Sequence, residues 1–145
     1  MMFLRNYYVN ATAKTDTLLI THDVKRALRE SEINDGTVLV LIPGGAAGVI
    51  LMEEDPKIHE AYRNWIEQQI PVSEGARPNR RSGTGRDSAH LRAALVGNQL
   101  SIPIQDGKLM TGNWQEVVLF DFDDKVGRRE ITVQILGDSP QGGEA

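Results

Sequence analysis

The order of apolar patterns along this chain constrains its fold more than any single motif does. Residues 56–70 keep a clear helical period, with the typical N-cap residue Asp55 before them and Pro56 at the first helical position. The apolar positions of that period are Ile58, Tyr62, Trp65, Ile66 and Ile70. Short runs typical of strands lie on both sides of this helix, so we expect both halves of the chain to contribute to a sheet.

The strand-like runs are short and are separated by turn residues. They span residues 3–13, 15–21, 37–43, 48–53, 100–104, 114–123 and 130–136. We expect the first two runs to lie antiparallel and the next two to form a hairpin. Asp106 and Gly107 predict a hairpin turn, and the last three runs predict a three-strand meander.

Two shorter helices complete the pattern. One is expected to start at Thr21 or Asp23 and to stop at the Asn-Asp-Gly turn of residues 34–36. The other is expected over residues 87–97, where Leu91, Ala94 and Leu95 would face the core. Three helices among these runs predict an α+β fold on a mixed, mostly antiparallel sheet.

The composition is that of one globular domain. The chain has 145 residues, of which 25% are charged and 40% are hydrophobic, which suits a single core. We assign residues 1–137 to that domain. Residues 138–145, which end in SPQGGEA, are expected to form a disordered tail.

Composition also disfavours several classes of function. No segment approaches the ~20 apolar residues needed to cross a bilayer, and the first ten residues lack the apolar core of a signal peptide. We therefore expect a cytoplasmic protein without a membrane partner. The absence of cysteine excludes disulfides, thiolate metal sites and thiol nucleophiles. The net charge of -4 argues against nucleic acid as a partner.

The passage LIPGGAAGVILMEED, residues 41–55, interrupts an apolar run with glycine and alanine. It lacks the Lys-Ser/Thr ending of a phosphate loop, and it does not lead into a helix as a dinucleotide-binding turn does. Two interpretations remain. The small residues let the backbone approach another segment or form a bulge, or they mark a site whose polar side chains are missing.

Histidine and arginine supply the candidate polar groups. His22 and His59 lie near helix starts and are expected on the surface. His90 directly follows the long loop of residues 71–85, which suits the edge of a pocket, although a surface or packed helix residue has the same spacing. The loop itself is rich in arginine, at positions 77, 80, 81 and 86. Guanidinium groups among glycines suit a phosphate or carboxylate, but the pattern is also typical of a solvated loop.

The stretch SIPIQDGKLMTGNWQ, residues 101–115, places the amides of Asn113 and Gln115 beside Trp114, which we expect to be at least partly buried. It resembles the signature of the YjbQ-like proteins, in which a serine, a proline-containing apolar strand, a glycine and Gly-Thr-Trp-Gln follow in fixed order. The likeness extends back through AHLRAALVG, with His90 on the family histidine, and forward through FDFDDKVGRREITVQILG. It covers about residues 15–137.

The resemblance implies an α+β domain that assembles as a homotrimer, with a polar pocket of clustered histidines. In some members it also implies a secondary thiamine-phosphate synthase activity, which joins a pyrimidine diphosphate to a thiazole phosphate and releases pyrophosphate. Placing Glu53 on the family glutamate puts residues 44–46 where the family has His-Thr-Thr, and a gapless alternative puts Pro43 on that histidine. A second family histidine would fall at Pro78 or Asn79. The chain is thus a divergent relative that lacks two family histidines.

Two functions remain open, and whether the chain is an enzyme is undecided. One is weak thiamine-phosphate synthase-type chemistry on phosphorylated small molecules, with His90 as general acid or base and Glu53 orienting it or the substrate. Arg81 or Arg86 would neutralise the phosphate. The other is a non-catalytic trimer that binds a small anion or serves as a scaffold. The remaining expected ligand contacts are Gly44, Gly45, Asn113 and Gln115. With two imidazoles lost, we expect no bound metal and no other cofactor.

Overall fold

A computed structural model describes residues 1–12, 16–71 and 86–139. Its helices are α1 (Thr21–Ser31), α2 (Pro56–Gln69) and α3 (Arg86–Val96). Its strands are β1 (Met2–Ala11), β2 (Thr17–Leu19), β3 (Asp35–Leu41), β4 (Ala47–Glu53), β5 (Gln99–Gln105), β6 (Lys108–Leu109), β7 (Gln115–Asp121) and β8 (Gly127–Asp138). The strand β8 takes up the first residue of the expected tail, and residues 140–145 lie outside the described ranges.

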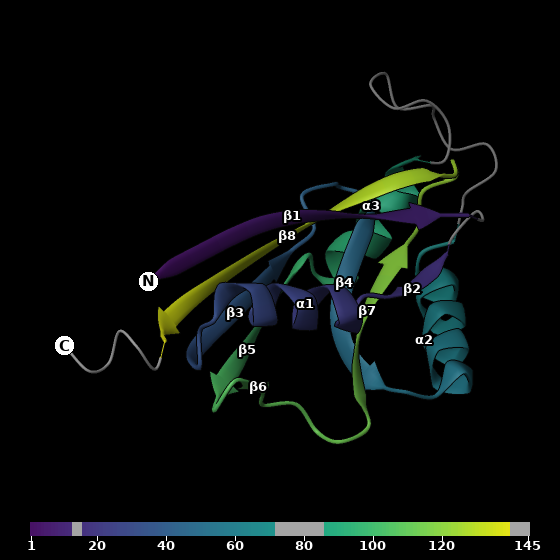
Figure 1. Ribbon diagram of the computed structural model, residues 1–145. Coiled ribbons are helices and arrows are strands. Elements are labelled where there is room, and N and C mark those ends of the chain that lie inside the picture. The colour runs from purple at the N-terminus through teal and green to yellow at the C-terminus, as the bar shows by residue number, and fades with distance from the viewer. Residues whose placement is uncertain (13–15, 72–85, 140–145) are drawn as a thin grey trace.

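The described strands form two sheets, and every pair is antiparallel. The larger sheet has the order β1-β8-β3-β5-β6 and the smaller one the order β2-β7-β4. In Figure 1 the long strands β1 and β8 run side by side, and α2 lies beside the smaller sheet. The predicted α+β class with three helices and mostly antiparallel strands is confirmed.

The sequence predicts strand positions better than strand partners. The β5–β6 hairpin turns at Asp106 and Gly107, which both have positive φ, as expected. The other predicted pairings are wrong, because β1 and β2 lie in different sheets, as do β3 and β4. The predicted meander is also absent, since β5 and β8 belong to the larger sheet and β7 to the smaller. Alternation along a strand specifies which side chains share a face, but it does not choose the neighbouring strand.

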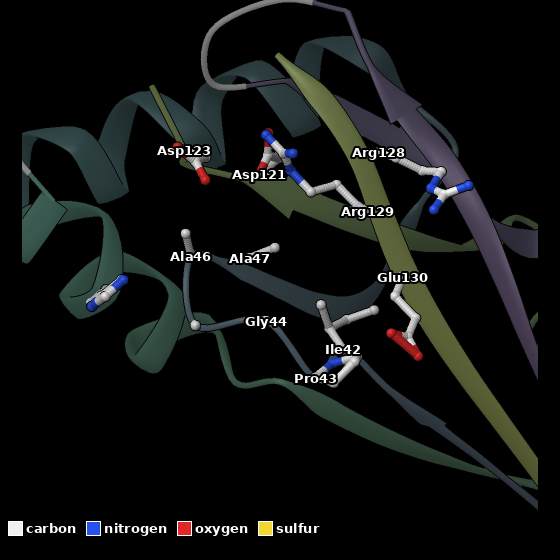
Figure 2. Close-up of a pocket in the computed structure, with 12 residues that line it drawn as sticks. Ile42, Pro43, Gly44, Ala46, Ala47, Asp121, Asp123, Arg128, Arg129 and Glu130 are labelled. Carbon is white, nitrogen blue, oxygen red and sulfur yellow. Dashed lines mark hydrogen bonds and ion pairs between the residues drawn. The ribbon is translucent and has the colours of Figure 1, made fainter. Parts of the chain in front are cut away.

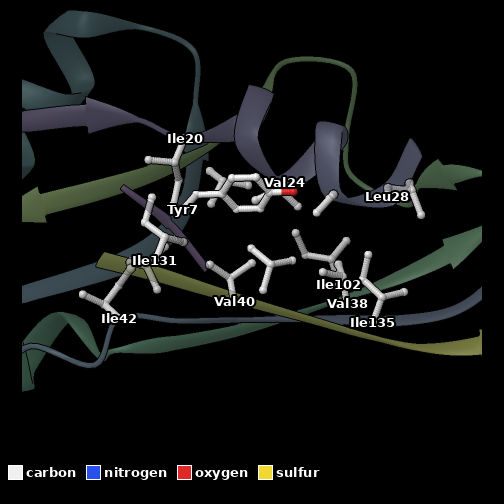
Figure 3. Packing of buried hydrophobic residues seen from close by; sticks show 14 of the residues in the cluster. Tyr7, Ile20, Val24, Leu28, Val38, Val40, Ile42, Ile102, Ile131 and Ile135 are labelled. Carbon is white, nitrogen blue, oxygen red and sulfur yellow. The ribbon is translucent and has the colours of Figure 1, made fainter. Parts of the chain in front are cut away.

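The first hydrophobic core contains residues from both sheets and from α1. The helix contributes Val24, Ala27 and Leu28, and the strands contribute alternate residues such as Val40 and Ile131. Figure 3 shows these side chains converging around Tyr7. Packing against the sheets fixes the position of α1, and α1 forms one wall of a cleft.

The second core lies on the other face of the smaller sheet. Val118 and Phe120 of β7 pack there against Ile66 of α2 and against Ala89 and Ala93 of α3. The alternate residues of β7 belong to the first core. Both faces of β7 are therefore covered within one chain, so its apolar sequence gives no argument for a neighbouring subunit.

Helix α2 begins as predicted but buries a slightly different face. The Asp55 side chain accepts a hydrogen bond from the Lys57 amide at 2.9 Å, a cap typically worth about 1 kcal/mol. Ile66 is buried, whereas Trp65 is 49% exposed. His59, expected at the surface, is buried. Its Nε2 donates a hydrogen bond to the Glu53 carbonyl oxygen at 2.7 Å, which satisfies the buried ring nitrogen.

Helix α3 presents the face opposite to the predicted one. Leu91 and Leu95 are 58% and 49% exposed, and Ala94 is exposed beside them. Ala89 and Ala93 are buried instead. Their small side chains let α3 lie close to the bulky residues of β7, which leucines at those positions would prevent. The outer face of α3 is consequently apolar and exposed at Leu91, Ala94 and Leu95.

Two local expectations are also corrected. The residue before α1 is Ile20, and no side chain caps that helix. Thr21 instead donates its hydroxyl to the Glu116 carboxylate and accepts from the Val117 amide at 2.9 Å, which ties α1 to β7. Trp114, expected to be partly buried, is 66% exposed.

Candidate functional site

A cleft of about 390 Å³ opens where the β3–β4 turn, α3 and the corner between β7 and β8 meet (Figure 2). We name it the His90 cleft. Residues 42–47 form one wall, His90 belongs to a second, and charged residues at positions 121–130 form the third. The fold thus brings three of the predicted site residues, Gly44, Gly45 and His90, into one place.

The glycines of this passage differ in their surroundings. A Cβ added at Gly44 would meet no atom within 4 Å, and one added at Gly45 would lie 3.7 Å from His90 Nε2. A Cβ at Gly48 would lie only 2.6 Å from Val96 Cγ1. None of the three has a positive φ. The close-packing interpretation therefore applies to Gly48, whereas Gly44 borders open space and a Cβ at Gly45 would only touch the His90 ring.

The strongest ionic contact of the cleft joins Asp121 and Arg129. Arg129 Nε donates to Asp121 Oδ1 at 2.9 Å and its terminal nitrogen donates to Oδ2 at 3.0 Å. The same guanidinium donates to the Lys125 carbonyl oxygen. Asp121 is fully buried, and hydrogen bonding to it raises the pKa of Arg129. The bidentate pair fixes the β7–β8 corner, so Asp121 is already neutralised before any ligand arrives.

The other charges of the cleft are more accessible. The Arg128 guanidinium carbon lies 4.4 Å from the centroid of the Tyr8 ring, a cation–π contact, and Glu130 follows on the same strand. Asp123 Oδ1 accepts from the Lys125 amide at 3.1 Å. Figure 2 shows Arg128 and Glu130 projecting from β8. Among the described ionisable lining residues, His90 and Arg128 are exposed, and Asp123 and Glu130 are partly exposed.

Sequence analysis did not single out these charged residues. A signal was present in the stretch DFDDKVGRRE, residues 121–130, where carboxylates follow a buried strand and arginines begin the next one. The short connection between β7 and β8 holds the two groups together. A charge run at the end of a fully buried strand is therefore a useful indicator of a fixed ion pair.

Asn113 and Gln115 lie in a different cleft. It measures about 560 Å³ and is bounded by α1, by Glu54 and by residues 107–117. We name it the Lys25 cleft. Gln115 Oε1 accepts from the Gly112 amide at 2.7 Å, so this side chain also closes the local turn. The strand register pairs Ala47 with Asp121 and Glu53 with Gln115, which places the two clefts about 20 Å apart at opposite ends of β7.

The remaining predicted site residues do not join His90 in the described structure. Glu53 is exposed at the Lys25-cleft end of β4, whereas His90 lies at the other end of that strand. Glu53 borders neither the His90 cleft nor the Lys25 cleft. Arg81 falls outside the described residues, and Arg86 begins α3 with a side chain that is not described. Within one chain, Glu53 is too distant to orient the His90 ring.

Two further findings concern metal binding and membrane spans among the described residues. No group of three or more His, Asp or Glu side chains in them is arranged to hold a metal ion. No helix in them is long and apolar enough to cross a bilayer.

The comparison with known proteins identifies the family. Residues 5–138 match the family model described as UPF0047 protein YjbQ-like. The chain belongs to this family. A UPF0047 protein of Methanocaldococcus jannaschii is 31% identical over 136 residues, covering 93% of this chain and 95% of the relative. A UPF0047 protein of Archaeoglobus fulgidus is 32% identical over 121 residues, covering 83% of this chain and 92% of the relative.

Solved structures show the same YjbQ-like fold. A YjbQ-like protein of unknown function from Sulfolobus solfataricus has a TM-score of 0.88 at 26% identity, covering 95% of this chain and 99% of that one. An uncharacterised YjbQ/UPF0047 protein from Clostridium acetobutylicum has a TM-score of 0.83 at 28% identity, covering 91% and 99%. Family membership, expected from residues 101–115, is confirmed. Activity must be argued from the site, because one fold supports many functions.

Proposed function

We propose that this YjbQ-like protein binds a small phosphate-containing anion in the His90 cleft. The observation that carries the proposal is the cleft wall at the glycine turn, in which Gly44 borders open space and Gly45 has no side chain between its backbone and the His90 ring. Phosphate oxygens accept hydrogen bonds from imidazole and from guanidinium groups alike. The missing side chains at the glycine turn leave room for such a group beside His90.

The fixed pair removes one carboxylate charge that would otherwise repel an anion. Arg129 neutralises Asp121, so that carboxylate repels an anion less than a free one would. Arg128 adds a positive charge, whereas Asp123 and Glu130 each add a negative one, so His90 and the loop arginines have to carry the binding. The arginine-rich loop leads directly into α3, which carries His90, and Arg81 and Arg86 remain proposed partners of the anion.

Weak thiamine-phosphate synthase-type chemistry is the second candidate function. It is favoured by the exposed position of His90 on the cleft wall, because a general acid or base must reach its substrate. Glu53 lies at the far end of β4 and does not support His90 in the same chain. We therefore rank anion binding above catalysis.

Phosphate-dependent stability tests the proposal. Inorganic phosphate at 100 times its Kd should stabilise the folded protein by about 2.7 kcal/mol relative to chloride of matched ionic strength. The double substitution His90→Ala and Arg128→Ala should reduce that increment by the share that the His90 cleft contributes. His22→Ala is the matched control, because this exposed histidine borders none of the described clefts. An unchanged increment in the double variant would contradict binding at this cleft.

An activity assay separates the two candidates. The wild-type protein is mixed with the pyrimidine diphosphate and the thiazole phosphate, and pyrophosphate release is measured. Release that disappears in His90→Ala would favour the enzyme. Phosphate binding without release would favour the binding protein.

We also propose that the chain assembles as a homotrimer, as the family resemblance implies. Leu91 and Leu95 support this, since they lie one turn apart on α3 and form an uncovered apolar stripe that a second copy could bury. Because His90 lies on the same helix, such a contact would border the cleft. Light scattering should give a trimer for wild type and a smaller species for the Leu91→Glu and Leu95→Glu double variant. A wild-type monomer would refute the assembly.

A further inference from the structure

We infer that the Lys25 cleft is a second ligand site, built for a small phosphorylated molecule that also carries hydroxyl groups. This inference does not rest on the function proposed for the His90 cleft, which lies at the opposite end of β7. Its volume of about 560 Å³ falls within the range of pockets that hold metabolite-sized ligands.

Three cationic side chains converge on this cleft from separate parts of the chain. Lys25 and Arg29 lie four residues apart on α1 and therefore on one face of the helix, and Lys108 comes from the β5–β6 hairpin. The spacing of these residues in the sequence does not predict that they lie together, because only the fold brings the β5–β6 hairpin next to α1. The convergence is notable in a chain whose net charge is -4.

The three cations lack partners within the part of the chain that the structure describes. No hydrogen bond or ion pair there engages the side chain of Lys25, Arg29 or Lys108. Another basic residue of α1, Arg26, contrasts with them, because it pairs with Asp23 at 3.1 Å. Like charges around a concave surface repel one another, and a bound anion would relieve that repulsion.

The other polar residues of the lining have a different chemistry. Asn113 and Thr111 contribute neutral polar groups, and Glu54 contributes a carboxylate. Glu116 is held by the Thr21 hydroxyl, so its position is fixed from the α1 side. Amides and carboxylates accept hydrogen bonds from hydroxyl groups, and carboxylates repel phosphates.

This division of the lining selects the class of ligand. Lys25, Arg29 and Lys108 favour a phosphate, and Asn113 and Glu54 favour hydroxyl groups. A long polyanion would bring negative charge against Glu54, whereas inorganic phosphate would leave the neutral polar groups unused. A sugar phosphate or a similar monoester meets both requirements.

Isothermal titration with ribose 5-phosphate tests the site, with ribose and inorganic phosphate compared at the same ionic strength. Wild type should bind ribose 5-phosphate more tightly than either fragment. The double substitution Lys25→Ala and Arg29→Ala should weaken binding by about tenfold or more, since charge-assisted hydrogen bonds are lost. Asn113→Ala should reduce the preference for ribose 5-phosphate over inorganic phosphate. Lys57→Ala, an exposed lysine outside this cleft, is the matched control.

The His90→Ala and Arg128→Ala double variant separates this inference from the proposed function. Retained ribose 5-phosphate binding in that variant, together with loss in the Lys25 and Arg29 variant, would establish the second site. The opposite pattern would overturn it and would place the phosphate in the His90 cleft. Absence of binding to wild type at millimolar ribose 5-phosphate would also overturn it. Circular dichroism would verify folding, which should persist because Lys25 and Arg29 are exposed.

Discussion

The His90 cleft and the Lys25 cleft lie at the two ends of β7 and use charge in opposite ways. In the first, Arg129 is committed to a bidentate contact with a fully buried Asp121. In the second, Lys25, Arg29 and Lys108 border open space without partners among the described residues. The first arrangement stabilises the fold, and the second leaves charge available to a ligand.

The difference shows that counting charges around a cavity is a poor guide to what it binds. The His90 cleft contains the family histidine, but much of its charge already serves the β7–β8 corner. The Lys25 cleft is lined partly by the signature stretch of residues 101–115, and its three cations are unpaired among the described residues. We therefore expect substitutions at the first cleft to affect stability and those at the second to affect mainly binding.

The largest effect is expected from Asp121→Ala. It leaves the Arg129 guanidinium, whose side chain is only 16% exposed, without its partner. Unpairing such a charge typically costs roughly 3–5 kcal/mol of unfolding free energy. Urea denaturation measures the loss. Asp23→Ala breaks the more exposed pair with Arg26 and should cost roughly 0.5 kcal/mol. Equal losses in both variants would mean that the Asp121 pair is not structural.

A smaller effect is expected from Gly48→Ala. The new Cβ would lie 2.6 Å from Val96 Cγ1 and 2.7 Å from the Gly97 carbonyl oxygen. Overpacking of this kind costs roughly 1–3 kcal/mol. Gly44→Ala, four positions earlier, meets nothing within 4 Å and should stay within about 0.5 kcal/mol of wild type. Thermal unfolding of the two variants would show whether one glycine supports packing while the other only shapes the cleft.

At the Lys25 cleft, Gln115→Ala should have a modest effect. It removes the acceptor of the Gly112 amide, a single exposed hydrogen bond worth about 1 kcal/mol. Chemical denaturation should therefore give a loss well below that of Asp121→Ala. A loss as large as the Asp121 value would indicate that this cleft is also structural, and the contrast between the two ends would disappear.

The smallest stability change is expected from Lys25→Ala combined with Arg29→Ala. Both side chains are exposed and unpaired among the described residues, so stability should change by about 0.5 kcal/mol or less. Denaturation without added anion measures this change. A large destabilisation would mean that the two cations hold the fold and are not free for a ligand.

The sequence predicts the helices and most strand positions because their periods reflect which residues must face a core. It does not predict the partners of β7, since alternation in this strand is compatible with several neighbours. Leu91 and Leu95 illustrate a related limit. Hydrophobicity favoured their burial, but close packing of α3 selected Ala89 and Ala93 for the inner face.

The candidate site, too, could be predicted from the sequence only in part. His90 and the glycine turn could be found from motif resemblance, because each aligns with a position of the family pattern, and the fold brings the two together at one end of β4. The grouping of Lys25, Arg29 and Lys108 could not, because it depends on which strand follows which in the larger sheet. Residue type alone gives no measure of whether a charge is already paired.

The pairing of β1 with β8 also determines when the protein can finish folding. Among the described strands β1 pairs only with β8, from Met2 opposite Leu136 to Ala11 opposite Gly127. During synthesis β1 therefore remains an unpaired, aggregation-prone strand until the ribosome has released the residues of β8. Such distant contacts raise the contact order and slow the final closure of the larger sheet, so this step is the one in which a chaperone would be most useful.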